Sequence, residues 1–216
     1  MKNKILSLFS IIWLLSLAIL VTIYLVWLSY PLAIDYFSLG DIVALPVKRI
    51  ANNFNDLMFF LTNPLKLELL MPDFPTSESG LKHFFDVKWL FHLAQAVAIV
   101  LALPSLSFFK EAFKKQRLWY YQRYYLFALI LPVLVAGFAF FIGFDNFFTL
   151  FHTLLFPGDS SWLFNPQTDP VILILPEEFF LACFIVFFIL YEAIMCLFYL
   201  MARRSLFNKL SKRSKN

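Results

Sequence analysis

The stretch Ser79 to Phe109, SGLKHFFDVKWLFHLAQAVAIVLALPSLSFF, decides the fold class of this chain. Its first ten residues include two lysines, a histidine and an aspartate, whereas the run from Trp89 to Phe109 contains no Lys, Arg, Asp or Glu. An apolar run of about 20 residues is long enough to cross the hydrocarbon core of a membrane as a helix. Titratable groups at the mouth of such a run are costly near lipid, which indicates a partner or a function for them.

The composition of the whole chain indicates that lipid is its main solvent. Of the 216 residues, 61% are hydrophobic and 15% are charged, whereas soluble domains are about half apolar and about a quarter charged. Phenylalanine is abundant, with 29 residues, and glycine is scarce, with 5. This balance favours broad apolar surfaces over glycine-rich phosphate-binding loops.

Four runs meet the length requirement for a membrane-spanning helix. The first run follows two lysines, as a signal peptide does, but it is too long for one and no small-residue cleavage site follows it, so we expect a retained helix. The chain is therefore expected to form a single all-α integral membrane domain over 1–216. Its spans are expected at about 5–30, 89–109, 124–144 and 179–202, and the two longer connections at about 31–88 and 145–178.

The distribution of charge sets the expected orientation. Twelve of the fourteen acidic residues fall in the two longer connections, whereas thirteen of the eighteen basic residues fall elsewhere. Because Lys and Arg flanking the spans stay in the cytoplasm, both termini are expected there and the longer connections outside the cell. Basic residues this close to a membrane argue against a nucleic-acid partner. The thirteen are Lys2, Lys4, Lys110, Lys114, Lys115, Arg117, Arg123, Arg203, Arg204, Lys209, Lys212, Arg213 and Lys215.

The first connection has its own secondary structure. Apolar residues from Val47 to Leu61 recur at helical spacing and predict an amphipathic helix. The segment Leu65 to Leu69 alternates like a short strand, and Val171 to Leu175 in the second connection is its expected partner. The sequence Ser77-Glu78-Ser79 predicts the start of a helix that runs straight into the second span.

Two histidines from different connections are expected at one level above the membrane. His83 lies five residues before Lys88, and His152 lies seven residues after Asp145. At the rise of a helix, both lie roughly 8–10 Å outside the apolar core. Imidazole both accepts and donates a proton near neutrality. A pair of histidines therefore suits a reaction that needs a base and an acid, such as acyl transfer.

Structural roles for the same residues stay open at this point. A lone histidine among aromatic residues is most often structural, and the pair leaves structural and catalytic roles evenly balanced. Lys88 fits an anchor at the membrane boundary, Asp86 a surface acid and Glu177 an acid at a helix N-terminus. Within the spans, His92 fits a packing role. Glu192 fits either a functional group or a protonated carboxyl bonded to a neighbouring helix.

A set of motifs in the connections, in this order on a four-span scaffold, resembles the lipoprotein intramolecular transacylase (Lit) family. The resemblance covers nearly the whole chain, and its specificity rests on the connections because the spans are generic. The motifs are His83-Phe84-Phe85-Asp86-Val87-Lys88, Phe151-His152, Trp162, Asn165-Pro166, Asp169 and Pro176-Glu177 followed by Phe179-Phe180.

The resemblance implies four transmembrane helices under an extracellular cap. It implies transfer of the sn-2 acyl chain of a diacylglyceryl group to the free α-amino group of the lipoprotein's N-terminal cysteine, giving a lyso-form lipoprotein. The partners would be that diacylglyceryl lipoprotein and membrane lipids, with no cofactor and no metal. The catalytic histidines of the family correspond to His83 and His152, and the expected supporting residues are Asp86, Lys88, Trp162, Asn165, Asp169 and Glu177.

The residues suit that chemistry. The attacking amine must be neutral, so a base is needed, and the departing glyceryl oxygen must be protonated, so an acid is needed. One histidine would serve as the base and the other as the acid, in an order that the sequence leaves open, and Asp86 would orient His83. Lys88, Asn165, a tryptophan indole or backbone N–H groups are candidate donors to the oxyanion.

Two other classes of function compete with this interpretation. A metal-dependent membrane hydrolase would use His83, Asp86, His152 and Glu177 as ligands, although the chain has no HExxH motif. A membrane scaffold or a small transporter would need no catalytic pair. Few titratable residues lie within the spans and no clear internal repeat is present, which disfavours a transporter.

Overall fold

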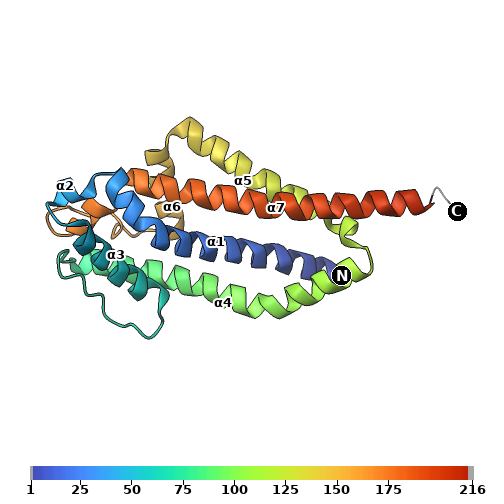
Figure 1. Ribbon diagram of the computed structural model, residues 1–216, viewed down its shortest axis with the longest axis horizontal. Helices are drawn as coiled ribbons and strands as arrows, with labels where there is room; N and C mark the ends of the chain where they lie inside the picture. The colour runs from blue at the N-terminus through green and yellow to red at the C-terminus, as the bar shows by residue number, and fades with distance from the viewer. Residues whose placement is uncertain (1, 214–216) are drawn as a thin grey trace. The chain divides into compact units, whose positions relative to one another are not determined.

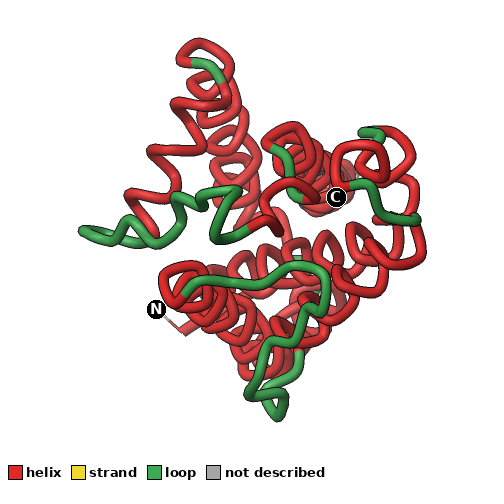
Figure 2. The backbone as a smooth tube through the Cα atoms, turned by 90° about the vertical axis from the view of Figure 1, so that its left-hand side faces the viewer, coloured by secondary structure: helices red, strands yellow, loops and turns green. Residues whose placement is uncertain are grey.

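The computed structural model describes the backbone of residues 2–213 and the side chains of residues 4–207. The regular secondary structure of this part of the chain is all helical, with loops between the helices and no strand, as Figure 2 shows. The elements, labelled in Figure 1 where there is room, are α1 (Lys2–Tyr36), α2 (Leu39–Val43), α3 (Val47–Thr62), α4 (Glu78–Lys114), the 3₁₀ helix η1 (Leu118–Tyr121), α5 (Gln122–Ile142), α6 (Phe144–Leu155), the 3₁₀ helix η2 (Pro170–Ile174) and α7 (Glu177–Arg213).

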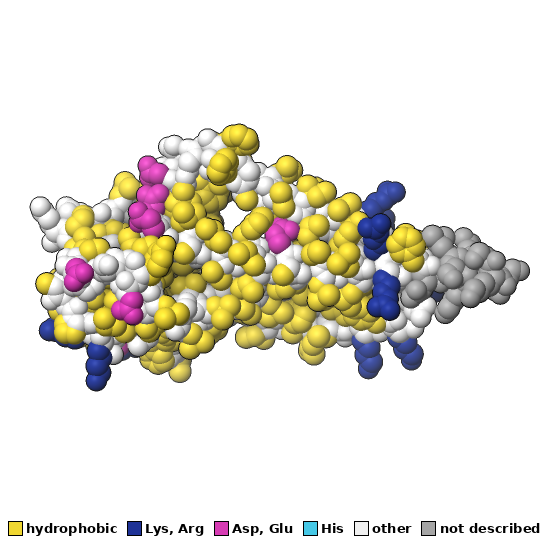
Figure 3. Space-filling view, turned by 45° about the horizontal axis from the view of Figure 1, so that its top comes forward, with side chains coloured by type: hydrophobic (Ala, Val, Ile, Leu, Met, Phe, Trp, Pro, Cys, Tyr) yellow, Lys and Arg dark blue, Asp and Glu magenta, His cyan; other side chains and the backbone are white. Residues whose placement is uncertain are grey.

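Four helices in the described part of the chain, α1, α4, α5 and α7, are long and apolar enough to cross a membrane. The predicted fold class is thereby confirmed as all-α with four candidate spans. Hydrophobic side chains dominate the visible surface in Figure 3, as expected for helices that face lipid. Five basic residues counted in the orientation argument have side chains outside the described part: Lys2, Lys209, Lys212, Arg213 and Lys215.

The predicted pair of short strands is not found among the described residues. Leu65 to Leu69 is an irregular loop, and the segment beginning at Pro170 is η2. In η2 the side chains of Val171 and Ile174 are buried. Residues three apart share one face of a 3₁₀ helix, so this spacing buries both side chains without a partner strand.

The ends of the long helices differ from the expected spans at several points, and two of these differences have a local cause. Helix α1 continues past Pro31 to Tyr36, and proline is tolerated inside such helices where the surroundings satisfy the freed carbonyl. The third apolar run does not reach residue 144 as one helix, because Gly143 has φ 83° and separates α5 from α6. Glycine adopts this left-handed conformation readily because it has no Cβ. By contrast, α3 and the start of α4 lie where the sequence predicts them.

The chain divides into two compact units. We call Val21–Leu93 together with Ile142–Phe184 the loop-rich unit, because it contains α2, α3, α6, η2 and the loops between them. The remaining described segments form the helical unit, which contains η1 and most of α5. Each unit has its own cluster of buried apolar side chains.

Small residues and interhelical hydrogen bonds hold the helical unit together. Ser10 on α1 lies 3.2 Å from the hydroxyl of Tyr125 on α5. The hydroxyl of Tyr191 on α7 donates to the Ala128 carbonyl at 3.1 Å. Ala18 is fully buried, which permits close helix approach. Close packing of small residues and such bonds are the usual forces between helices in lipid.

Tyr30 is the hub of the loop-rich unit. It is fully buried, and its hydroxyl donates to the Ile174 carbonyl of η2 at 2.7 Å. Its ring stacks on Phe54 of α3, with ring centroids 3.5 Å apart, and meets Phe179 of α7 edge-on at 5.5 Å. One side chain therefore joins α1 to three other elements.

We expect Tyr30→Phe to lower the thermal midpoint of the detergent-solubilised protein by several degrees. The substitution keeps the ring contacts but leaves the buried Ile174 carbonyl without its donor, a loss of about 1–3 kcal/mol. In a protein of this size, each kcal/mol is worth about 2–4 °C.

Tyr36→Phe is the matched control, because Tyr36 lies on the same helix and is 82% exposed. Equal thermal midpoints for the two variants would show that the Tyr30 hydroxyl does not stabilise this unit.

Candidate active site

The loop-rich unit contains a cavity of about 330 Å³. Its lining comes from α1, α3, α4, α6, η2 and α7 and consists almost entirely of apolar side chains, mostly phenylalanine and leucine. His83 and His152 are two of the few polar side chains that reach it. A mostly apolar cavity with a few convergent polar groups is typical of a site for a small molecule or a lipid.

The structure brings the two predicted histidines together. His83 is buried on the second turn of α4, and His152 is half-buried near the end of α6. The centroids of their rings lie 5.8 Å apart. The rings are thus close enough for one substrate to contact both.

A backbone carbonyl fixes the tautomer of His152. Its Nδ1 lies 2.8 Å from the carbonyl oxygen of Phe148, one turn earlier on α6. Because a carbonyl only accepts, Nδ1 carries the proton and Nε2 of the neutral ring keeps a lone pair. The pKa of His152 lies below its ordinary value because burial disfavours the charged ring, although the bond to Phe148 acts in the opposite direction. His152 is therefore arranged as a proton acceptor.

One ring nitrogen of His83 lacks a hydrogen bond in the described part of the chain. Its Nδ1 is buried and has no hydrogen-bond partner in the described part of the chain. Phe156 and Phe164 pack against its ring edge-on, with centroids at 5.0 and 5.6 Å. A buried polar atom without a partner costs about 1–3 kcal/mol, so a structure that keeps one points to a functional role for the ring.

Trp162 is the predicted supporting residue that lines the cavity. Its indole stacks on His152, with ring centroids 4.8 Å apart and an interplanar angle of 26°. The indole N–H donates to the Asp159 carbonyl at 3.1 Å. The indole N–H is thus already engaged, which disfavours Trp162 among the candidate donors to the oxyanion.

Asp169 is buried and joins the second connection to the start of α4. Its carboxylate accepts the backbone N–H of Ser77 at 2.7 Å and the Ser77 hydroxyl at 2.9 Å. The Ser77 hydroxyl oxygen in turn accepts the N–H of Gly80 at 3.0 Å and so caps α4 as predicted. A Cβ at position 80 would lie 2.2 Å from the Asp169 carboxylate, so this close approach requires glycine.

Lys88 and Asp86 occupy different environments from those expected. Lys88 is buried, donates to the carbonyl oxygen of Lys66 and lies over the ring of Phe60 at 4.3 Å. It therefore holds the loop after α3 and is neither an exposed anchor nor part of the cavity wall. Asp86 bonds Lys82 at 3.3 Å. The expected contact in which Asp86 orients His83 is not among its hydrogen bonds in the described structure.

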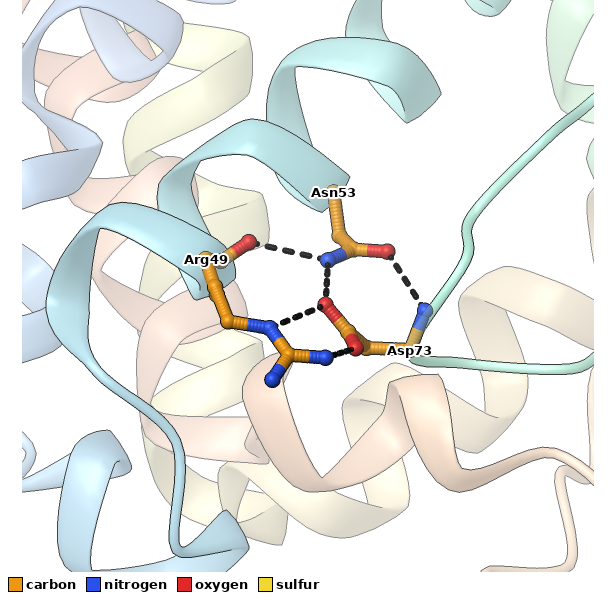
Figure 4. A network of polar contacts seen from close by, with 3 residues as sticks. All are labelled: Arg49, Asn53 and Asp73. Atoms are coloured by element: carbon orange, nitrogen blue, oxygen red, sulfur yellow. Dashed lines mark hydrogen bonds and ion pairs between the residues drawn. The ribbon is translucent and has the colours of Figure 1, made fainter.

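A polar network fastens the same loop to α3. Figure 4 shows Arg49, Asn53 and Asp73 in mutual contact. The Arg49 guanidinium pairs with the Asp73 carboxylate. The Asn53 side-chain N–H also donates to that carboxylate at 2.7 Å, and the Asn53 side-chain oxygen accepts the backbone N–H of Asp73 at 3.1 Å. Hydrogen bonds from Arg49 and Asn53 lower the pKa of Asp73. The loop after α3 is therefore held near its start, where Lys66 bonds Lys88, and near its end, where Asp73 bonds α3.

The other candidate residues lie away from the cavity. Asn165 is exposed, and its side-chain oxygen accepts the Gln167 N–H at 3.0 Å, which makes it a turn residue. Glu177 is exposed in the first turn of α7. Neither lines the cavity, and His92 does not line it either. Glu192 belongs to the helical unit, where it borders a shallow groove between α5 and α7.

The ligands proposed for a metal-dependent hydrolase are dispersed. Among the described residues, no group of three or more His, Cys, Asp or Glu side chains is placed to hold a metal ion. His83 and His152 meet without a nearby carboxylate ligand, because Asp86 pairs with Lys82 and Glu177 faces outward. The arrangement suits acid–base chemistry better than metal ligation.

Several functional neighbours carry no signal that singles them out in the sequence. Phe148 contributes through its backbone carbonyl, and Phe156 and Phe164 are three-dimensional neighbours of His83 among 29 phenylalanines. Lys82 pairs with Asp159, 77 residues away.

Comparison with known proteins gives matches among solved structures and one family model. No curated protein sequence matches the chain. Solved structures of the membrane-integral lipoprotein intramolecular transacylase Lit from Bacillus cereus do match. One is 26% identical with a TM-score of 0.86, covering 97% of this chain and 96% of that chain. Two variants of that protein, with a histidine replaced by arginine or by alanine, match with TM-scores of 0.78 and 0.79 at 27% and 26% identity, each covering 97% of this chain and 94% of the other.

The sequence model of one family, described as lipoprotein intramolecular transacylase Lit, matches residues 4–180, which include both histidines and the whole loop-rich unit up to the first turn of α7. The chain belongs to the lipoprotein intramolecular transacylase family.

Proposed function

We propose that this chain is an acyltransferase that moves the sn-2 acyl chain of a diacylglyceryl lipoprotein to the α-amino group of the same lipoprotein's N-terminal cysteine. The observation that carries the proposal is the pair of imidazoles, 5.8 Å apart in an apolar cavity, in a member of this family. The product is the lyso-form lipoprotein. The site faces the outside of the cell and both termini lie in the cytoplasm, in keeping with the distribution of basic residues.

The reaction begins with loss of a proton from the substrate amine. His152 is the base, because its Nδ1–H is held by Phe148 and the lone pair on Nε2 is free to accept the proton. Its lowered pKa keeps the ring neutral at pH 7, so the base is ready without prior deprotonation. The neutral amine nitrogen then attacks the ester carbonyl carbon.

The second half of the reaction releases the glyceryl oxygen. A new C–N bond forms, the ester C–O bond breaks, and the electron pair of that bond goes to the glyceryl oxygen. His83 donates a proton to this oxygen, and the proton taken by His152 replaces it, so no net proton enters or leaves. At a ring separation of 5.8 Å, one substrate molecule can contact both imidazoles, so its amine reaches one ring and its glyceryl oxygen reaches the other.

The cavity walls contribute positioning and exclusion of water. Acyl chains of the substrate suit a lining of phenylalanine and leucine. Holding the amine and the ester of one molecule together supplies proximity, which is worth several kcal/mol in well-aligned reactions. The same walls keep out the water that would otherwise hydrolyse the ester.

Replacement of either histidine tests the proposed roles. We expect His83→Ala and His152→Ala each to lower transfer by about 10²- to 10⁴-fold, the usual contribution of a general acid or base. The double variant should lose little more than either single variant, because the two groups act on one proton path. Mass spectrometry of a diacyl lipopeptide incubated with the purified protein measures the shift of one acyl chain to the amine.

The third histidine provides the control. His92→Gln removes a histidine of the same helix that does not line the cavity, and it should transfer at the wild-type rate. Normal product from both His83→Ala and His152→Ala, with correct folding, would refute the catalytic pair.

Titration of His152 tests the proposed base. Because burial disfavours the imidazolium, we expect its pKa below the ordinary value of about 6.5. The ring should then be neutral at pH 7 and become protonated only as the pH falls further. NMR of protein labelled with ¹³C in the histidine rings gives the midpoint, with His152→Gln identifying the resonance. A midpoint at or above 6.5 would contradict the proposed environment.

A further inference from the structure

We infer that Lys82 is a positioning residue for the acyl transfer, acting through its ion pair with Asp159 to hold Trp162 against His152. The inference rests on the proposed function and goes beyond it, because neither Lys82 nor Asp159 lines the cavity.

The first link joins α4 to the turn that follows α6. Lys82 lies one residue before His83, and its ammonium contacts the Asp159 carboxylate. The other oxygen of that carboxylate accepts the backbone N–H of Ser161 at 2.9 Å. Asp159 therefore uses one oxygen to hold α4 and the other to shape its own turn.

The second link runs from the turn to the histidines. The Asp159 carbonyl oxygen accepts the Trp162 indole N–H at 3.1 Å, and the indole stacks on His152 at 4.8 Å. The Asp159 N–H donates to the Phe156 carbonyl at 3.1 Å, and the Phe156 ring meets His83 edge-on at 5.0 Å. One turn thus places one aromatic ring against each imidazole.

Because the ion pair is exposed, its effect on the position of Trp162 can be measured apart from any effect on the stability of the fold. The side chains of Lys82 and Asp159 are 57% and 24% exposed, and exposed pairs contribute little to the stability of the fold. A displacement of about 1 Å between reacting groups, however, can lower a rate about 100-fold. Bonds from Lys82 and from the Ser161 N–H lower the pKa of Asp159 to about 2, so its charge is present across the assay range.

The test compares turnover and substrate affinity in variants of the full-length protein, assayed with a diacyl lipopeptide in detergent. Lys82→Met and Asp159→Asn should each lower kcat about 10- to 100-fold, with KM near the wild-type value because neither variant replaces a side chain that lines the cavity. The double variant should be no slower than the slower single variant, because both changes remove the contact between Lys82 and Asp159, and Lys82→Met also removes the bond to Asp86. Lys82→Arg keeps the charge and should restore most of the activity.

A matched control comes from the C-terminal end of the same helix. Lys115→Met breaks the pair between Lys115 and Glu111 at 2.6 Å, whose side chains are about half exposed. It should leave kcat unchanged. Thermal midpoints of all these variants should match that of the wild type.

Any of three outcomes for the Lys82→Met variant would overturn the inference. Its kcat equals that of the wild type, its KM rises while its kcat is unchanged, or its activity falls only in proportion to the amount of folded protein. Absence of lyso-form product from the wild-type protein itself is a separate result, which would count against the proposed function.

Discussion

The hydrogen bond from the Tyr30 hydroxyl to the Ile174 carbonyl is the contact on which the loop-rich unit depends. Irregular backbone such as η2 is tolerable near lipid only where its polar groups find partners inside the protein. Tyr30 supplies a partner from α1, and its ring packs on Phe54 and Phe179 at the same time. Phe54 and Phe179 also line the cavity. The shape of the cavity therefore depends on one buried tyrosine that does not itself line it.

The polar loops around the cavity share one way of being held in place. In each, a charged side chain satisfies backbone or side-chain groups of a segment distant in sequence: Lys88 for the loop after α3, Asp169 for the start of α4, and Lys82 for the turn beside His152. Charge is scarce in this chain, and these few charged residues use it to hold the loops. The apolar walls alone specify a hydrophobic space, whereas these few charges specify where its loops lie.

The spans and the histidine pair were predictable because their signals are local. Apolar runs of sufficient length and the spacing of His83 and His152 from their spans are visible in one pass along the chain. The strand prediction failed because alternation over five residues does not distinguish a strand from a loop or a 3₁₀ helix. Lys88 was misread because its position at the edge of an apolar run resembles an anchor, and only the folded loop reveals its bond to Lys66. Lys82 and Asp159 were missed because their pairing joins residues 77 positions apart.

The enclosed position of the two imidazoles has a consequence for turnover. In the proposed mechanism, the proton removed from the amine ends on the glyceryl oxygen, so the protein finishes each cycle in the ionisation state in which it began. The site consequently needs no chain of water molecules or acidic residues leading to the bulk solvent. An enzyme of this kind can keep its chemistry behind phenylalanine walls and open only to exchange one lipid-bearing molecule for another.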